Sequence, residues 1–189
     1  MDAKQVLALI KEKDVKFVDF RFTDPRGKWQ HTARMASATD ADTFSDGVMF
    51  DGSSIAGWKG IEASDMTLML DPASAHLDPF FAQTTMAIFC DVIEPSTGQL
   101  YERDPRGIAK KAEAYLLQTG IGDKVFFGPE AEFFIFDDVR YSVTPQKVSF
   151  QIDSHAAAWN TDTEYDSGNQ AHRAGHKGGY FPVNPIDEG

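Results

Sequence analysis

The sequence predicts an α+β fold made of two units. A short helical pattern and several strand-like runs share the first hundred residues, and a second helical pattern begins directly after Asp104. Hydrophobic residues make up 42% of the chain and aromatic residues 12%, which is typical of a chain that can bury a core. We place a domain boundary near residue 104, so that the predicted units are residues 1–104 and 105–189.

The first unit is predicted to open with a helix and a hairpin. Apolar residues recur at helical spacing over residues 3–13. Apolar and polar residues alternate over residues 15–22, VKFVDFRF, which predicts a strand with one mostly apolar face. Pro25 and Gly27 then suit a turn, so residues 28–35 are predicted to be the returning strand.

Residues 37–64 are predicted to be mostly an ordered loop. They hold no long periodic run, but they contain four glycines with aromatic residues between them, and such loops often carry function. Two further strands are predicted at residues 66–70 and 84–92, with a turn at residues 94–99.

The second unit is predicted to begin with a helix. Asp104 can cap this helix, Pro105 suits its first turn, residues 108–117 give an apolar stripe, and Gly120 can end it.

The rest of the second unit is predicted to hold few elements. Residues 124–136 indicate a buried strand pair or one kinked strand, and residues 146–153 another strand. The chain is mostly polar from Asn160 onward. Because these elements are too few to cover the apolar run 125–136, we expect the chain to be a fragment or to need a partner.

Charge and hydropathy exclude two classes of protein. The chain carries 18 Lys and Arg against 29 Asp and Glu, a net charge of −11, which excludes a nucleic-acid binder that acts through a basic surface. No run approaches the roughly 20 apolar residues that cross a bilayer, and the N-terminus lacks the pattern of a signal peptide, so we expect a cytoplasmic protein.

The single cysteine, Cys90, excludes an internal disulfide, and its apolar neighbours predict a buried structural thiol.

The sharpest chemical signal is the run GPEAEFF at residues 128–134. On an extended segment, Glu130 and Glu132 share one face among apolar neighbours, where two ionised carboxylates need a cation or an arginine. Their separation of roughly 6.6 Å favours one metal ion on each, and oxygen ligands favour Mg²⁺ or Mn²⁺. The alternative is an edge strand whose two Glu side chains face water.

Two other runs give weaker signals. In MFDGSSIAGW, residues 49–58, Asp51 precedes small hydroxyl residues, which suits a cation or polar-ligand site but also an ordinary Asp-Gly turn. HRAGHKGGYFP, residues 172–182, places two His four residues apart, but its glycines argue against a helix and no Glu follows the first His. A histidine metal site is therefore disfavoured there.

Taken together, five runs closely resemble the N-terminal part of a bacterial type I glutamine synthetase. They are FVDFRFTDPRGKWQHT, MFDGSSIAGWKGIEASDM, RDPRGIAKKAE, FFGPEAEFFIF and HKGGYFPVNP. The resemblance covers essentially all 189 residues, whereas chains of that family are much longer. It implies a β-grasp-like N-terminal domain over residues 1–104, then the start of a catalytic domain built on a curved antiparallel sheet with helices. It also implies a homo-oligomer, a dodecamer of two hexameric rings, with each active site between two neighbouring subunits.

The resemblance implies ATP-dependent condensation of glutamate with ammonia to glutamine through γ-glutamyl phosphate. Glu130 and Glu132 match acids that each bind one of two divalent ions, Mg²⁺ or Mn²⁺, which position ATP and glutamate. Asp51 matches a loop acid that binds ammonium and takes its proton, so that ammonia can attack. Ser54 and Tyr180 match positions that line this ammonium pocket. Asp51 and Ser54 would act on the neighbouring subunit's site.

The departures from the family pattern define the alternatives. Ala174 and His176 replace commoner residues and are expected to adjust their loop without removing Tyr180. Most of the family's remaining ligands and nucleotide contacts would lie beyond Gly189, so we expect the 189 residues alone to be inactive. Two other functions are a non-catalytic module that joins a full-length ring and a γ-glutamyl amide ligase that uses an amine. The DGSS run and the KGGYFP tyrosine favour ammonia.

Overall fold

A computed structural model describes residues 1–133, 136 and 138–153 of the chain. Contacts between residues divide the chain into two units, Met1–Phe126 and Phe127–Gly189. The helices and strands of the first unit, in chain order, are α1 (Ala3–Glu12), β1 (Phe17–Thr23), β2 (Trp29–Met35), α2 (Ala41–Asp46), β3 (Val48–Asp51), β4 (Asp65–Leu70), β5 (His76–Asp78), β6 (Thr85–Glu94), β7 (Gln99–Leu100) and α3 (Pro105–Thr119). No described helix has both the length and the apolar character needed to span a bilayer.

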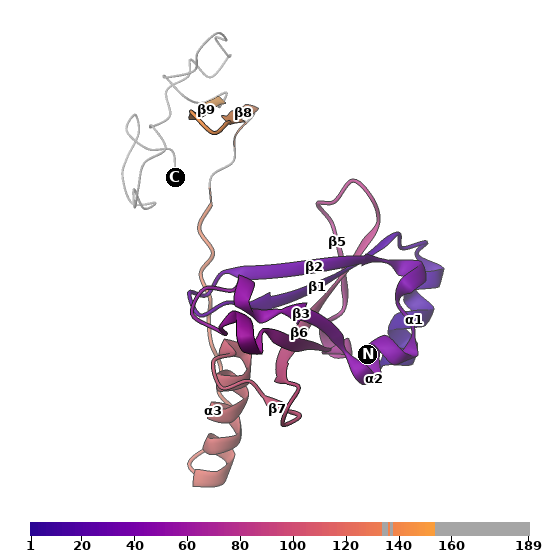
Figure 1. Cartoon of the computed structure of the whole chain (residues 1–189), viewed down its shortest axis with the longest axis vertical. Coiled ribbons are helices and arrows are strands. Elements are labelled where there is room, and N and C mark those ends of the chain that lie inside the picture. Colours follow the sequence, from indigo (N-terminus) through magenta and orange to yellow (C-terminus); the bar gives the residue numbers. More distant parts are fainter. Residues whose placement is uncertain (134–135, 137, 154–189) are drawn as a thin grey trace. The chain divides into compact units, whose positions relative to one another are not determined.

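The first unit is built around one mixed sheet whose main path runs β2-β1-β6-β4-β3 (Figure 1). β1 and β6 are parallel, and the other pairs along the path are antiparallel. The short strands β5 and β7 also pair with β6. The ten-residue strand β6 therefore joins the two halves of the sheet.

The core lies on one face of this sheet, because every second side chain of its central strands points inward. In Figure 1, α1 and α2 lie together at one end of the sheet, and they contact each other. Both helices begin with a capping box, on Asp2 and Asp40 respectively, which satisfies backbone amides of their first turn. The core side chains from the helices and the three central strands are Val6, Ile10, Val18, Phe20, Phe22, Phe44, Met66, Leu68, Leu70, Met86, Ile88, Cys90 and Val92.

Helix α3 is anchored to β6 at its first turn. Asp104 is fully buried; its Oδ1 accepts a hydrogen bond from the Arg106 amide and its Oδ2 accepts one from the Val92 amide, both at 3.1 Å. Arg106 Nε donates to Asp91 Oδ1 at 2.8 Å. Gly120, with φ of +67°, ends the helix in the left-handed conformation that glycine allows. The predicted cap, first turn and end of this helix are thus confirmed.

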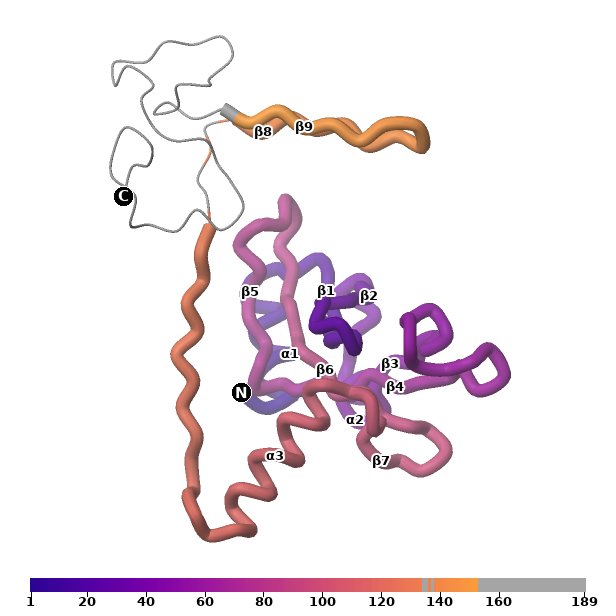
Figure 2. The backbone as a smooth tube through the Cα atoms, turned by 90° about the vertical axis from the view of Figure 1, so that its left-hand side faces the viewer, coloured from indigo at the N-terminus to yellow at the C-terminus, as the bar shows by residue number. Residues whose placement is uncertain are grey.

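The described part of the second unit holds one hairpin, formed by β8 (Asp138–Val143) and β9 (Val148–Asp153). Figure 2 shows the two strands running side by side, and their register places Tyr141 opposite Phe150. Apolar side chains alternate with polar ones along both strands, so one face of the hairpin is apolar and largely exposed. The strand predicted at residues 146–153 is confirmed as β9.

Several other sequence predictions are confirmed. The helix over residues 3–13, the hairpin after it, and the strands at residues 66–70 and 84–92 correspond to α1, β1–β2, β4 and β6. The prediction for Cys90 is also confirmed, because the side chain is 1% exposed and burial raises the pKa of its thiol.

Two predictions are wrong in part. The segment predicted as mostly loop, residues 37–64, also contains α2 and β3, each too short to show a periodic pattern. Residues 124–133 form no strand, and Phe126 and Phe127 are 88% and 85% exposed. A strand needs a neighbour to pair its backbone groups, and no described strand pairs with this segment.

Candidate functional site

One predicted site has its hydrogen bonds within the described residues, and it begins at Asp51, the last residue of β3. β3 pairs with β4 in a register that sets Asp51 opposite Asp65, and a single 3₁₀ turn, Gly52–Ser54, follows. Asp51 Oδ1 accepts hydrogen bonds from the Ser53 amide at 2.8 Å and the Ser53 hydroxyl at 2.6 Å. Asp51 Oδ2 accepts one from the Ser54 hydroxyl at 3.2 Å. The structure thus brings together Asp51 and Ser54 and adds Ser53.

The carboxylate of Asp51 is exposed and held in its charged form. Hydrogen bonds from the Ser53 hydroxyl and the Ser53 amide are the main cause that lowers the pKa of Asp51 below its ordinary value. A charged, accessible carboxylate with oriented hydroxyl groups beside it can bind a small cation.

Gly52 fits this turn because a larger residue would collide with β4. A Cβ atom on Gly52 would lie 2.5 Å from Met66 Cγ and 3.1 Å from the Ser64 carbonyl oxygen. The Gly52 amide also donates to that carbonyl at 2.7 Å. The close approach of the two backbones therefore fixes where Asp51 stands relative to β4.

Beyond Ser54, the chain is held by a cluster of four aromatic rings, which we call the aromatic anchor: Phe22, Phe50, Trp58 and Tyr101. The ring of Trp58 lies 5.6 Å from Phe22, 6.0 Å from Phe50 and 5.5 Å from Tyr101, centroid to centroid. Trp58 is 6% exposed, so the loop buries its largest side chain in the core of its own unit. Such pairs contribute about 0.5–1.5 kcal/mol each beyond the area they bury.

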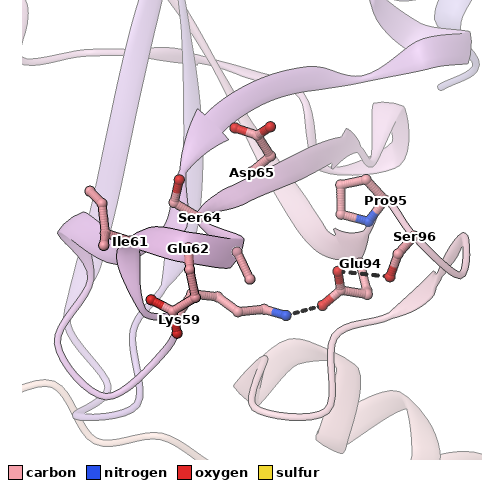
Figure 3. Close-up of a pocket in the computed structure, with 9 residues that line it drawn as sticks. Lys59, Ile61, Glu62, Ser64, Asp65, Glu94, Pro95 and Ser96 are labelled. Atoms are coloured by element: carbon pink, nitrogen blue, oxygen red, sulfur yellow. Dashed lines mark hydrogen bonds and ion pairs between the residues drawn. The ribbon is translucent and has the colours of Figure 1, made fainter.

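Charged side chains fix the same loop to the end of β6 and to the segment before α3. Lys59 Nζ forms a salt bridge with Glu94 Oε2 and lies 5.2 Å from the centre of the Tyr101 ring. Arg103 Nη1 donates to the Gly57 carbonyl at 2.7 Å. Figure 3 shows Lys59 and Glu94 facing each other along a pocket of about 580 Å³, which is also lined by Glu62, Asp65 and Ser96.

Sequence reasoning missed these supporting residues. The signal for Ser53 was present, because a residue two places after Asp commonly donates its amide to the Asp side chain. The signal for Trp58 was weaker, since one aromatic residue among glycines does not say where the ring packs. Nothing near Arg103 in the sequence pointed to Gly57, which lies 46 residues earlier in the chain.

Glu130 and Glu132 lie in the second unit, on the exposed segment that precedes β8. Both side chains face solvent, and no third carboxylate, His or Cys side chain gathers with them among the described residues. Two exposed carboxylates two residues apart still suit Mg²⁺, which commonly takes one or two carboxylates and completes its shell with water and phosphate oxygens. Tyr180 and the run at residues 172–182 lie outside the described residues.

Comparison with known proteins places the chain in a family. Residues 14–95 match the model for "Glutamine synthetase, beta-Grasp domain", and residues 102–189 match "Glutamine synthetase, catalytic domain". Over 182 residues the chain is 65% identical to a glutamine synthetase of Cereibacter sphaeroides, covering 96% of this chain and 39% of that protein. It is 64% identical to one of Rhodobacter capsulatus, covering 98% of this chain and 42% of that protein.

Solved structures agree with these matches. The cryo-EM structure of Plasmodium falciparum glutamine synthetase aligns with a TM-score of 0.69 at 27% identity, over 99% of this chain and 37% of that one. A structure of GmaS with ADP aligns over 60% of this chain and 25% of that one, with a TM-score of 0.54 at 23% identity, a likeness of fold alone. The chain therefore spans about 40% of the length of the curated relatives that it matches.

Proposed function

The chain belongs to the glutamine synthetase family, and from this premise we propose that it contributes to the ATP-dependent condensation of glutamate with ammonia. The observation that carries the proposal is the Asp51 carboxylate, which is charged, exposed and held by the hydroxyl groups of Ser53 and Ser54. The chain would supply the ammonium-binding half of an active site that a neighbouring subunit completes. We further propose residues 1–104 as the β-grasp-like domain and the residues from 105 onward as the start of the catalytic domain.

In this proposal, Asp51 binds ammonium and receives its proton. Ammonium cannot attack a carbonyl because its nitrogen has no free electron pair, so one N–H bond must break first. The ammonia that forms adds to the γ-carbonyl carbon of γ-glutamyl phosphate, and phosphate leaves with the electrons of its bond to that carbon. The added nitrogen loses one further proton to the departing phosphate, which leaves the neutral amide. The charged form of Asp51 favours ammonium binding, and Ser54 and Tyr180 complete the pocket.

Glu130 and Glu132 would each hold one divalent ion, Mg²⁺ or Mn²⁺. When bound, these ions neutralise the phosphate oxygens during phosphoryl transfer from ATP to the γ-carboxylate of glutamate. The chain's own contribution is two hard oxygen ligands on one short segment, which suits ions of this class. The assembly in which the two halves meet is proposed to be the ring-forming homo-oligomer of the family.

The proposal is tested with a chimera that joins residues 1–189 of this chain to the remaining residues of the Cereibacter sphaeroides relative. We expect the purified chimera to form glutamine from glutamate, ammonium and ATP with Mg²⁺, and the 189 residues alone to form none. The variant Asp51→Asn should lower kcat/KM for ammonium by about 10²–10⁴-fold, the range for loss of an acid–base group. Asp46→Asn makes the same change of charge on the exposed end of α2 and should leave activity unchanged.

Three results would contradict the proposal. An assembled chimera that makes no glutamine would leave the chain a non-catalytic module. Preference for methylamine over ammonium would indicate a γ-glutamyl amide ligase that uses an amine. Full activity of the Asp51→Asn chimera would remove Asp51 from the chemistry.

A further inference from the structure

The loop that carries Asp51 is held from outside by a short segment that immediately precedes α3. The loop leaves β3 at Asp51 and rejoins the sheet at Asp65, the first residue of β4. Between these ends its middle contacts Tyr101 and Arg103, which lie more than 40 residues later in the chain. Arg103 falls inside the match to the catalytic domain, residues 102–189, whereas the loop falls inside the match to the β-grasp domain, residues 14–95.

Two consecutive hydrogen-bonded turns connect Asp51 with the point that Arg103 holds. The Ile55 amide donates to the Gly52 carbonyl at 3.2 Å, and the Trp58 amide donates to the Ile55 carbonyl at 3.1 Å. Arg103 then binds the carbonyl of Gly57, whose φ of +86° turns the chain back toward Lys59. These two turns therefore link the Gly57 region to the peptide that follows Asp51.

The backbone at Arg103 is held in place by the residue that follows it. The next residue, Asp104, is fully buried and bonded to the Val92 amide of β6. The side chain of Arg103 is 57% exposed, so it adds little to the core. Its described polar contacts are the Gly57 carbonyl at 2.7 Å and the carboxylate of Glu102 at 3.9 Å. The hydrogen bond to Gly57 is the shorter and more directional of the two contacts. The side chain therefore contributes more to holding the loop than to the stability of the core.

We propose that Arg103 is a positioning residue for the ammonium-binding carboxylate: by holding the Gly57 carbonyl, it sets the orientation of the Asp51 turn. The inference rests on the proposed function for its consequence in catalysis, but the contact it concerns can be tested without catalysis. Lys59, two residues after Gly57, holds the same part of the loop through Glu94 and the Tyr101 ring. The start of the catalytic domain would thereby fix a loop of the β-grasp domain in the same chain.

The first test measures hydrogen exchange in the 189-residue chain. In Arg103→Gln, the amides of Ile55 and Trp58 should exchange about three- to tenfold faster, because their turns lose the external support, while amides of β4 and β6 keep their rates. Arg103→Lys, which keeps a cationic donor, should restore most of the protection. Arg34→Gln, at an exposed position on β2, is the matched control and should change no loop amide.

The second test uses the active chimera. Arg103→Gln should raise the KM for ammonium about three- to tenfold while kcat at saturating ammonium and the KM values for glutamate and ATP stay unchanged. A purely structural role would instead lower the active fraction and therefore kcat.

The two tests separate the inference from the proposed function. If loop exchange and the ammonium KM are both unchanged in Arg103→Gln, the positioning role is wrong and the proposed function stands. If the chimera is inactive, the proposed function fails. Unchanged exchange in Arg103→Gln would then overturn the positioning role of Arg103 as well. Faster exchange at Ile55 and Trp58 supports the holding of the loop by Arg103 whether or not the chimera is active.

Discussion

The Asp51 carboxylate accepts two hydrogen bonds from Ser53 and one from Ser54, and the bond from the Ser53 hydroxyl is shorter than that from Ser54. The Ser53 hydroxyl should therefore do more to keep this group charged. The hydrogen bond that the Ser53 backbone amide donates to Asp51 does not depend on the side chain, so an alanine variant keeps it. Ser53, which is not among the site residues predicted from the sequence, thus has a larger effect on the Asp51 pKa than Ser54.

We expect Ser53→Ala to raise the pKa of Asp51 toward its ordinary value, and Ser54→Ala to raise it by a smaller amount. Because the folded-state pKa is lowered, Asp51 stabilises the fold above its ordinary pKa, and this contribution is lost as pH falls through the lowered value. Carbon-13 NMR titration of the carboxyl groups in the 189-residue chain measures both shifts. An equal or larger shift in Ser54→Ala would contradict the expectation.

Single residues also show which parts of the site a sequence can predict. Asp51 and Ser54 follow from a local pattern of an acid, a glycine and two hydroxyls, because all their contacts fall within three residues. Lys59, Tyr101 and Arg103 could not be assigned in the same way. Their contacts join positions 35 to 46 residues apart, and such pairings exist only once the sheet has formed.

At the scale of one element, α3 depends on the buried carboxylate that begins it. Asp104→Ala should destabilise the fold by about 1–3 kcal/mol, since the buried Val92 amide then has no acceptor and the helix loses its cap. Urea unfolding of the 189-residue chain measures this loss. Asp2→Ala removes the cap of α1 at an exposed site and should cost less, because water replaces the lost acceptor there.

The same residue has a predictable pH dependence. Burial raises the pKa of Asp104, so the folded state holds its proton more tightly than the unfolded state does. Relative to Asp104→Asn, the wild-type chain should lose stability as pH rises from the ordinary Asp pKa through the raised value. A constant difference in urea midpoint between the two proteins across this range would show that burial does not control the titration.

Elements were predicted well where they are long and poorly where they are short. α1, α3, β1 and β6 each repeat a helical or alternating pattern over seven or more residues. α2 has six residues and β3 has four, which is too few for a period to stand out, although the capping box of Asp40 and Thr43 was present as a signal. The segment before β8 failed for another reason: its Phe and Val residues suit a strand, but no described strand pairs with it.

At the scale of the whole chain, exposed apolar surface should govern behaviour in solution. On the apolar face of the β8–β9 hairpin, Tyr141 and Phe150 are opposite each other and 78% and 76% exposed. We expect the 189-residue chain to associate, with a mass by light scattering above that of one chain. The double variant Tyr141→Ser with Phe150→Ser should reduce association.

A matched control lies on the other face of the same hairpin. Ser142 and Ser149 are also opposite each other, and replacing both with Ala should leave association unchanged. A monodisperse monomer at all concentrations would contradict the prediction. Equal effects of the two double variants would show that association does not use this face.

The division of the whole chain into domains was only partly accessible from the sequence. The helix pattern after Asp104 led us to place the boundary near residue 104, and that position stays a prediction. The two family matches separate between residues 95 and 102, whereas residue contacts separate the units after Phe126. Contacts assign α3 to the first unit because it packs against β1 and β6.

The place of β6 in the sheet has a consequence for biosynthesis. β1 pairs with β2 on one side and in parallel with β6 on the other, so Phe17–Arg21 meet their second set of partners only at Thr85–Phe89. A ribosome therefore releases α1, β1 and β2 well before the strand that completes their layer. Throughout this interval the core that buries Val18, Phe20 and Phe22 lacks the side chains of β6, and incompletely packed apolar strands of this kind are prone to aggregate. Translation speed between β2 and β6 thus determines how long the nascent chain is open to aggregation.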